Sequence, residues 1–209
     1  METGLDFREV HELDGGQKVV LRHIQPDDAA ELRRAFLALS PESRYRRFFG
    51  AVNDLDDRTL EYLTHVDGKD HVALVATLES LDLKTERGIG VARFVRSHVD
   101  PTVAEAAVVV VDDMQRKGIA TMLMQALARA ARERGIDRFR CEVLKSNDVV
   151  VGSLLDVGAV VVERGPDTVV LDVPLVDTND SLVHRALRIV SEHINAFLRR
   201  LVPPILKEP

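Results

Sequence analysis

The residues from Gln115 to Thr121 carry the clearest chemical pattern in the chain. They read Gln-Arg-Lys-Gly-Ile-Ala-Thr, a basic turn with one glycine, and they lead directly into an amphipathic segment. The start of a helix presents backbone N–H groups without partners inside the helix, together with the positive end of its dipole. Arg116 and Lys117 add positive charge, and Gly118 lets the backbone approach a ligand closely. The pattern predicts an anion seat best suited to a pyrophosphate.

A strand and a helix must hold this turn in place. The run Ala106–Val111 reads AAVVVV, which is too uniformly apolar for a one-sided strand and predicts a strand buried on both faces. After the turn, Ile119, Leu123, Leu127 and Ala130 recur at steps of three and four, the spacing of an amphipathic helix. Gly135 is the expected residue just past the end of that helix.

The rest of the chain predicts an α+β fold with a mostly antiparallel mixed sheet flanked by helices. Residues 1–16 end in two glycines and are expected to form a lead-in or an edge hairpin. Strands are expected over 18–24, 71–78, 88–95, 139–144, 159–163 and 168–173, in addition to the central one. Helices are expected over 26–38, from residue 40 onward, from residue 56 to before residue 67, and over 149–156.

Beyond Pro174 the pattern changes. Apolar residues from Val183 to Leu201 form one stripe at helical spacing, which predicts an appended C-terminal helix ended by Pro203. We therefore expect a domain over 1–176 and a helical extension over 177–209. The stripe must be covered, either by the rest of its own domain or by a second copy in a homodimer.

Composition restricts the function classes. At 209 residues the chain suits one full core, and its net charge of −6 argues against a general nucleic-acid binder. One cysteine excludes a disulfide framework, and the seven histidines show no metal-ligand spacing, so no metal is expected. No apolar run approaches the roughly 18 residues of a membrane span, and no signal sequence is evident. A cytoplasmic protein without membrane or nucleic-acid partners is the expectation.

The segment Gln115-Arg116-Lys117-Gly118-Ile119-Ala120 resembles the Q/R-x-x-G-x-G/A signature of the GNAT N-acetyltransferases. The apolar strand before it and the helix after it extend the resemblance, which covers roughly Lys18 to Leu175. Within that superfamily, the chain is most similar to the catalytic domain of bacterial protein lysine acetyltransferases of the Pat type. The resemblance implies a GNAT fold and acetyl-CoA as cosubstrate, with its pyrophosphate held at residues 115–121.

The resemblance also implies roles for the central strand. It places the general base at Glu105, ten positions before Gln115, where desolvation is expected to raise the carboxyl pKa toward working pH. It implies that the strand splays away from its neighbour and that Val109, Val110 and Val111 offer N–H groups to the pantetheine amides and the thioester oxygen. Asp112, Asp113 and Glu142 are alternative bases, although the two aspartates are better explained as shaping the turn.

The same resemblance concerns Asn147 and Leu154, whereas the expectation for Cys141 comes from the residues around it. Asn147 is expected to bind the pantetheine arm, to cap the following helix, or both. Many GNAT enzymes carry a tyrosine general acid seven residues later, but that position holds Leu154 here, so no acid is assigned. Cys141 lies in an apolar strand and is expected to be a core residue rather than an acyl carrier.

The resulting expectation is an N-acetyltransferase that moves acetyl from acetyl-CoA to a primary amine, by direct attack in a ternary complex. A protein lysine side chain is the favoured acceptor. Two alternatives stay open: an acetyltransferase for a small amine, and an acyl-CoA-binding sensor without catalysis.

Overall fold

The structure is a computed structural model that describes residues 7–48, 52–78 and 86–175, with only the backbone described for 45–48. An eight-stranded sheet runs through it in the order β1-β2-β3-β4-β5-β6-β8-β7. All neighbouring strands are antiparallel except β5 and β6, which are parallel. The strands are β1 Arg8–Glu12, β2 Lys18–His23, β3 His71–Leu78, β4 Arg87–Arg96, β5 Val103–Val110, β6 Arg138–Leu144, β7 Val160–Arg164 and β8 Thr168–Pro174.

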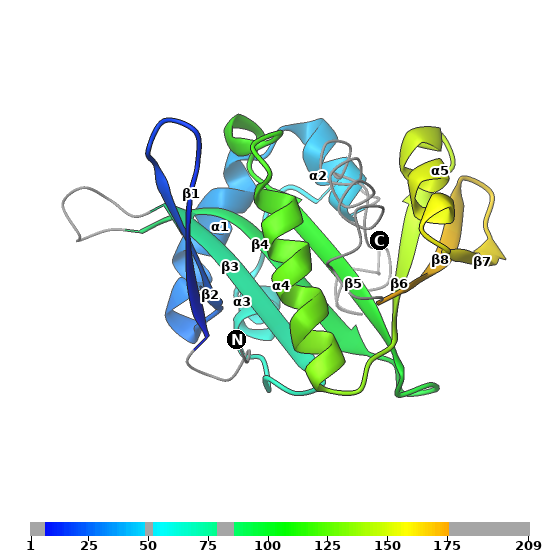
Figure 1. The fold of residues 1–209 in the computed structure, drawn as a ribbon. Coiled ribbons are helices and arrows are strands. Elements are labelled where there is room, and N and C mark those ends of the chain that lie inside the picture. The colour runs from blue at the N-terminus through cyan, green and yellow to red at the C-terminus, as the bar shows by residue number, and fades with distance from the viewer. Residues whose placement is uncertain (1–6, 49–51, 79–85, 176–209) are drawn as a thin grey trace.

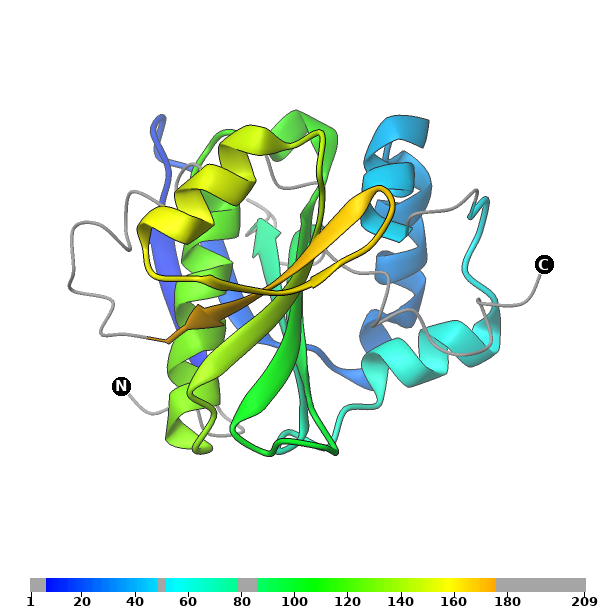
Figure 2. The ribbon, with the colours of Figure 1, turned by 90° about the vertical axis from the view of Figure 1, so that its right-hand side faces the viewer.

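Helices cover both faces of the sheet (Figures 1 and 2). They are α1 Ala29–Ala38, α2 Pro41–Phe48, α3 Asp57–Thr64, α4 Ile119–Glu133 and α5 Asp148–Asp156, with two short 3-10 turns at Pro26–Asp28 and Asp112–Met114. Figure 2 shows α1, α2 and α3 on the side of the sheet opposite α4. This is the predicted α+β architecture, a mostly antiparallel mixed sheet flanked by helices.

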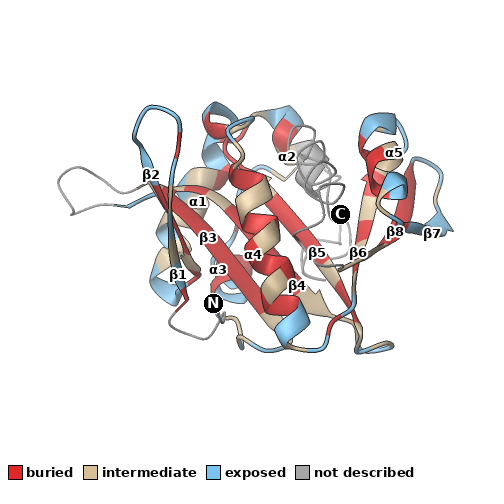
Figure 3. Cartoon of the chain, in the orientation of Figure 1, coloured by how far each residue is buried: buried red, intermediate tan, exposed pale blue. Residues whose placement is uncertain are grey.

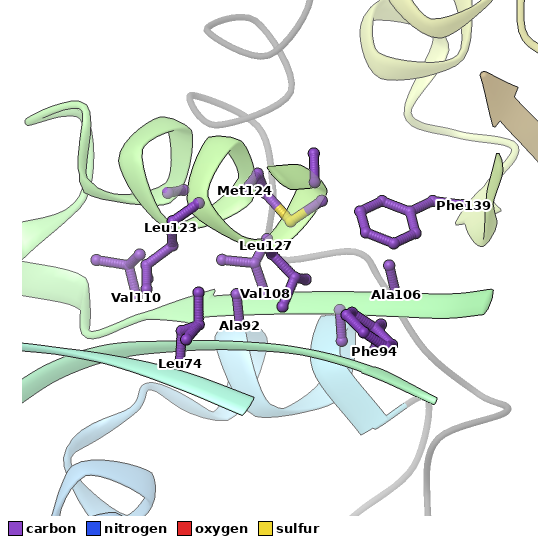
Figure 4. Close-up of a cluster of buried hydrophobic side chains, with 14 of the residues drawn as sticks. Leu74, Ala92, Phe94, Ala106, Val108, Val110, Leu123, Met124, Leu127 and Phe139 are labelled. Atoms are coloured by element: carbon purple, nitrogen blue, oxygen red, sulfur yellow. The ribbon is translucent and has the colours of Figure 1, made fainter. Parts of the chain in front are cut away.

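The main core lies between α4 and the sheet (Figures 3 and 4). Leu123 and Leu127 of α4 are fully buried against apolar side chains of β3, β4 and β5. Their spacing of four residues puts them on one helix face, as the sequence predicts. A smaller apolar cluster lies under α1 and α3 and contains Phe36, Leu55 and Leu63.

The predicted end of α4 is confirmed. Gly135 has φ +73°, a backbone conformation that suits glycine. The Ile136 N–H donates to the Ala131 C=O at 3.0 Å, and the Gly135 N–H donates to the Arg132 C=O at 2.9 Å. These two bonds form a Schellman motif, which satisfies carbonyl groups that a helix end otherwise leaves unpaired.

The other predicted elements occur where they were expected, including an edge hairpin of β1 and β2. The appended helix over 177–209 and the domain boundary before it fall outside the described residues.

Candidate active site

The turn before α4 has the backbone of an anion seat. Gly118 occupies the N-cap of α4 with φ +80°. Two positions before it, Arg116 also has a positive φ, +61°, which no other non-glycine residue among the described ones has. The first hydrogen bond of the helix runs from the Met122 N–H to the Gly118 C=O, so the amides of residues 119–121 lie ahead of the intrahelical ladder. The Ile119 side chain is buried, whereas Arg116 and Lys117 are exposed. Apolar side chains thus anchor the turn while its two cationic side chains stay exposed.

Gln115 and Asp112 hold this turn against the strand before it. The Gln115 side-chain amide donates to the Val110 C=O at 3.1 Å and to Asp112 Oδ1 at 2.7 Å. Asp112 also accepts from the Ser40 N–H at 2.6 Å and from the hydroxyl of Ser43 in the first turn of α2. The signature glutamine therefore connects β5, the anion seat and α2.

Asp113 forms an ion pair with Arg87 at 2.8 Å. The carboxylates of both aspartates that the sequence offers as alternative bases are thus engaged by neighbouring residues.

Strands β5 and β6 pair only over a short stretch. Their parallel register covers Val103–Glu105 against Arg138–Arg140 and stops there. Figure 1 shows the two strands diverging beyond that point, and we call this divergence the V. Along the described part of the chain, no strand pairs with Ala106–Val110 on that side of β5.

Hydrogen bonds on the other side of β5 decide which amides face the V. The Val111 N–H donates to the Ile89 C=O at 3.0 Å, so it belongs to the pairing with β4. An antiparallel ladder uses every second residue, so the Val109 N–H also points toward β4. The prediction for Val109 and Val111 is therefore wrong. Val110 and the unpredicted Val108 present their N–H groups to the V.

Glu105 lies at the closed end of the V. It is half-buried, pairs across the register with Arg140 on β6 and with Val95 on β4, and points to the face opposite α4. The pKa of Arg140 is raised, mainly by its hydrogen bond with Asp172, whereas burial lowers it. The negative charge of Glu105 also raises the pKa of Arg140, so Glu105 and Arg140 interact electrostatically. Burial raises the pKa of the Tyr62 phenol on α3, and the negative charge of Glu105 raises it further.

The remaining candidates lie around the V. Asn147 occupies the N-cap of α5, where its C=O accepts from the Val150 and Val151 amides, but its side chain makes no cap hydrogen bond. Leu154 is buried in the core. Glu142 accepts a hydrogen bond from the Thr168 hydroxyl at 2.7 Å. Burial raises the pKa of the Cys141 thiol well above its usual value, which agrees with the core role predicted for it.

Sequence reasoning missed a polar group on the face of the sheet opposite α4. Arg93 on β4 is fully buried, donates to the Leu63 C=O at 3.0 Å and lies 3.1 Å from the His71 ring nitrogen Nε2. The Tyr62 ring packs against the His71 ring at 5.1 Å between centroids. A single charged residue inside the apolar run Val91-Ala92-Arg93-Phe94-Val95 was the available signal.

Neither a membrane span nor a metal cluster appears among the described residues. None of their helices has the length and apolar character needed to cross a bilayer. No group of three or more His, Cys, Asp or Glu side chains within the same residues is arranged to hold a metal ion.

Comparison with known proteins identifies the architecture. Residues 30–153 match the family model described as the acetyltransferase (GNAT) family. The chain is 37% identical over 165 residues to the acetyltransferase Pat of Mycolicibacterium smegmatis, covering 78% of this chain and 48% of that protein. It is 31% identical over 127 residues to the acetyltransferase PA5475 of Pseudomonas aeruginosa, covering 60% of this chain and 66% of that protein. The chain thus spans about half the length of the first relative.

A solved structure supports the same assignment. The GNAT domain of PAT from S. lividans superposes with a TM-score of 0.68 at 31% identity, covering 80% of this chain and 96% of that domain.

Proposed function

Because the chain belongs to the GNAT acetyltransferase family, we propose that it transfers an acetyl group from acetyl-CoA to a primary amine, namely the side chain of a protein lysine. One observation carries the proposal: a single strand–turn–helix unit holds the anion seat, the V and Glu105. The residues 115–121 would bind the CoA pyrophosphate, and Asn147 would contact the pantetheine arm. The Val108 and Val110 amides, which face the V, would bind the pantetheine and the thioester oxygen.

The reaction is a direct transfer. A lysine amine has a pKa of about 10.4 and is protonated near neutral pH, so Glu105 takes its proton before or during attack. The amine nitrogen bonds to the thioester carbon, and the carbonyl oxygen gains negative charge next to the Val108 and Val110 N–H groups. The C–S bond then breaks. A thiolate is a good leaving group, since thiols have a pKa of about 8.5, so Leu154 in the place of a tyrosine acid does not prevent turnover.

The choice of a protein lysine rests on the resemblance to the Pat type. The location proposed is the cytoplasm, with no metal cofactor in the reaction. Homodimer formation through the segment after residue 176 is part of the same proposal.

The decisive experiment is incubation with radiolabelled acetyl-CoA and a bacterial whole-cell extract, followed by separation into protein and small-molecule fractions. We expect label in protein, on lysine residues by mass spectrometry, and at least about a hundredfold slower labelling with Glu105→Gln. Label confined to small molecules would contradict the lysine acceptor. Absence of label in both fractions, with acetyl-CoA still bound, would instead indicate a sensor.

A further inference from the structure

A cavity lies on the face of the sheet opposite α4, beneath α1 and α3. It encloses about 70 Å³, room for several water-sized groups. Its walls are mostly apolar and include Phe36, Leu55, Leu63 and Val109. Three residues that line it have a buried polar atom without a hydrogen-bond partner among the described residues: Arg93 Nε, Thr77 Oγ1 and Glu31 Oε2. Of these three atoms, Glu31 Oε2 forms an ion pair with Arg34.

Arg93 supplies a positive charge to this cavity. Its side chain is 2% exposed, and burial lowers its pKa to about 10, so the guanidinium stays charged at neutral pH. One of its terminal nitrogens donates to the Leu63 C=O near the end of α3, and the other lies against His71. Burial, together with the Arg93 charge, lowers the pKa of His71 to about 4, so the ring is neutral and accepts this bond.

Within the described parts of the chain, no full negative charge balances Arg93. Among the described residues, no carboxylate lies within ion-pair distance of it. The two acids that line the cavity serve other partners: Asp28 pairs with Arg22 at 2.8 Å, and Glu31 pairs with Arg34 and accepts from the Gly88 N–H. The Leu63 carbonyl offers only the partial charge of a short helix end. A buried charge without a counter-charge is costly, so the site is built for an anion.

We infer that this cavity receives a carboxylate carried by one of the two substrates, and that Arg93 pairs with it. The inference rests on the proposed acyl transfer, because Val109 lines the cavity and lies between Val108 and Val110 of the V. Because side chains alternate along a strand, Val109 places the cavity on the face of β5 that also carries Glu105. The carboxylate belongs either to a dicarboxylic acyl group that takes the place of acetyl on CoA, or to an amine acceptor that is a free amino acid instead of a protein lysine. Each source keeps the acyl transfer and changes one of the two proposed substrates, and both present the same chemistry to Arg93.

Binding of small probes tests the site without any turnover. Glutarate and its uncharged analogue glutaramide are titrated against the wild-type protein by calorimetry. We expect glutarate to bind at least tenfold more tightly than glutaramide, and Arg93→Met to remove that preference. Arg33→Met is the matched control, because Arg33 is an exposed arginine of α1 that pairs with Asp54 outside the cavity. It should keep the preference.

Kinetics then separate the two sources. In one arm, succinyl-CoA is compared with uncharged 4-methylpentanoyl-CoA for a fixed amine. In the other, Nα-acetyl-lysine is compared with its carboxamide for acetyl-CoA. The ratio of kcat/KM for the charged over the neutral compound should fall at least tenfold in Arg93→Met in one arm, which identifies the substrate that carries the carboxylate. No fall in either arm would overturn the inference.

Because Arg93 also donates a hydrogen bond at the end of α3, Arg93→Met could fail to fold. The inference can still be tested in that case. The wild-type comparison of glutarate with glutaramide needs no variant, and equal or absent binding of the two overturns the inference directly. An enzyme without turnover that still prefers glutarate would refute the proposed function while keeping the anion site.

Discussion

Glu105 on β5 and Arg140 on β6 form the last residue pair of the parallel ladder before the two strands diverge. Arg140 is held in turn by two hydrogen bonds to Asp172, at 2.7 and 2.8 Å. Asp172 is 5% exposed, so this pairing is sheltered from water. A carboxylate at the closed end of the V thus has a fixed cationic neighbour, next to the amides proposed to hold the thioester.

Replacing Glu105 with glutamine should remove the proposed general base while keeping a side chain of the same size. General-base catalysis contributes roughly 10²- to 10⁴-fold, so we expect kcat for Glu105→Gln to fall within that range. The affinity for CoA, measured by calorimetry, should not change. Glu142→Gln is the control, because Glu142 on β6 bonds to Thr168, and its kcat should stay close to wild type. If the Glu142 variant loses turnover instead, the base has been assigned to the wrong carboxylate.

Gly118→Ala tests the backbone of the anion seat. Gly118 has φ +80°, and an added Cβ would meet only the Met122 methyl, at 3.9 Å, so the cost is one of backbone conformation. We expect a stability loss of about 1 kcal/mol together with weaker CoA binding. Gly15→Ala, at φ +95° with nothing within 4 Å of a Cβ, should cause a similar loss and leave CoA binding intact. Equal effects of the two variants on CoA affinity would contradict the seat.

His71 should make the fold sensitive to acid. In the unfolded chain it takes up a proton near pH 6.5, whereas in the fold burial lowers its pKa to about 4. Between these values the unfolded state binds more protons, so stability falls as pH drops from 6.5 to 4. The loss from His71 is about 3 kcal/mol at most.

Urea unfolding of the wild type and of His71→Phe across this range measures the effect. The variant should show a shallower decline with falling pH, because it has no imidazole to protonate. Two neighbouring charges also affect the pKa of His71: Arg93 lowers it and Asp67 raises it. Both residues are retained in the His71→Phe variant. Identical slopes for the two proteins would show that the pKa of His71 is not lowered.

Gly90→Ala tests how closely β4, β5 and α4 pack. An added Cβ would lie 3.1 Å from the Leu123 Cδ1 atom and 3.1 Å from the Val109 carbonyl oxygen. We expect a loss of about 1–3 kcal/mol in the free energy of unfolding. In α5, Gly152→Ala meets nothing within 4 Å and should gain up to about 1 kcal/mol. Thermal unfolding compares the two, and an unchanged Tm for Gly90→Ala would contradict the close approach.

Features that depend on neighbours along the chain could be predicted from the sequence. The buried strand, the glycine turn and α4 follow from local composition, from a backbone angle that suits glycine, and from the helical spacing of apolar residues. The end of α4 at Gly135 was predicted for the same reason, since a Schellman motif involves only nearby residues. The GNAT family itself was recognised from this unit, because its signature is contiguous in sequence.

Only the tertiary structure decided which backbone amides face the V. The N–H groups of a strand alternate between its two neighbours, and a shift of one residue exchanges them. The hydrogen bond between Val111 and Ile89 determines which N–H groups of β5 face β4. The sequence of β5 alone does not specify this pairing. The buried charge of Arg93 was hidden for a related reason. Its cavity is formed by helices and strands distant in the chain, so its lack of a counter-charge becomes visible only when they pack together.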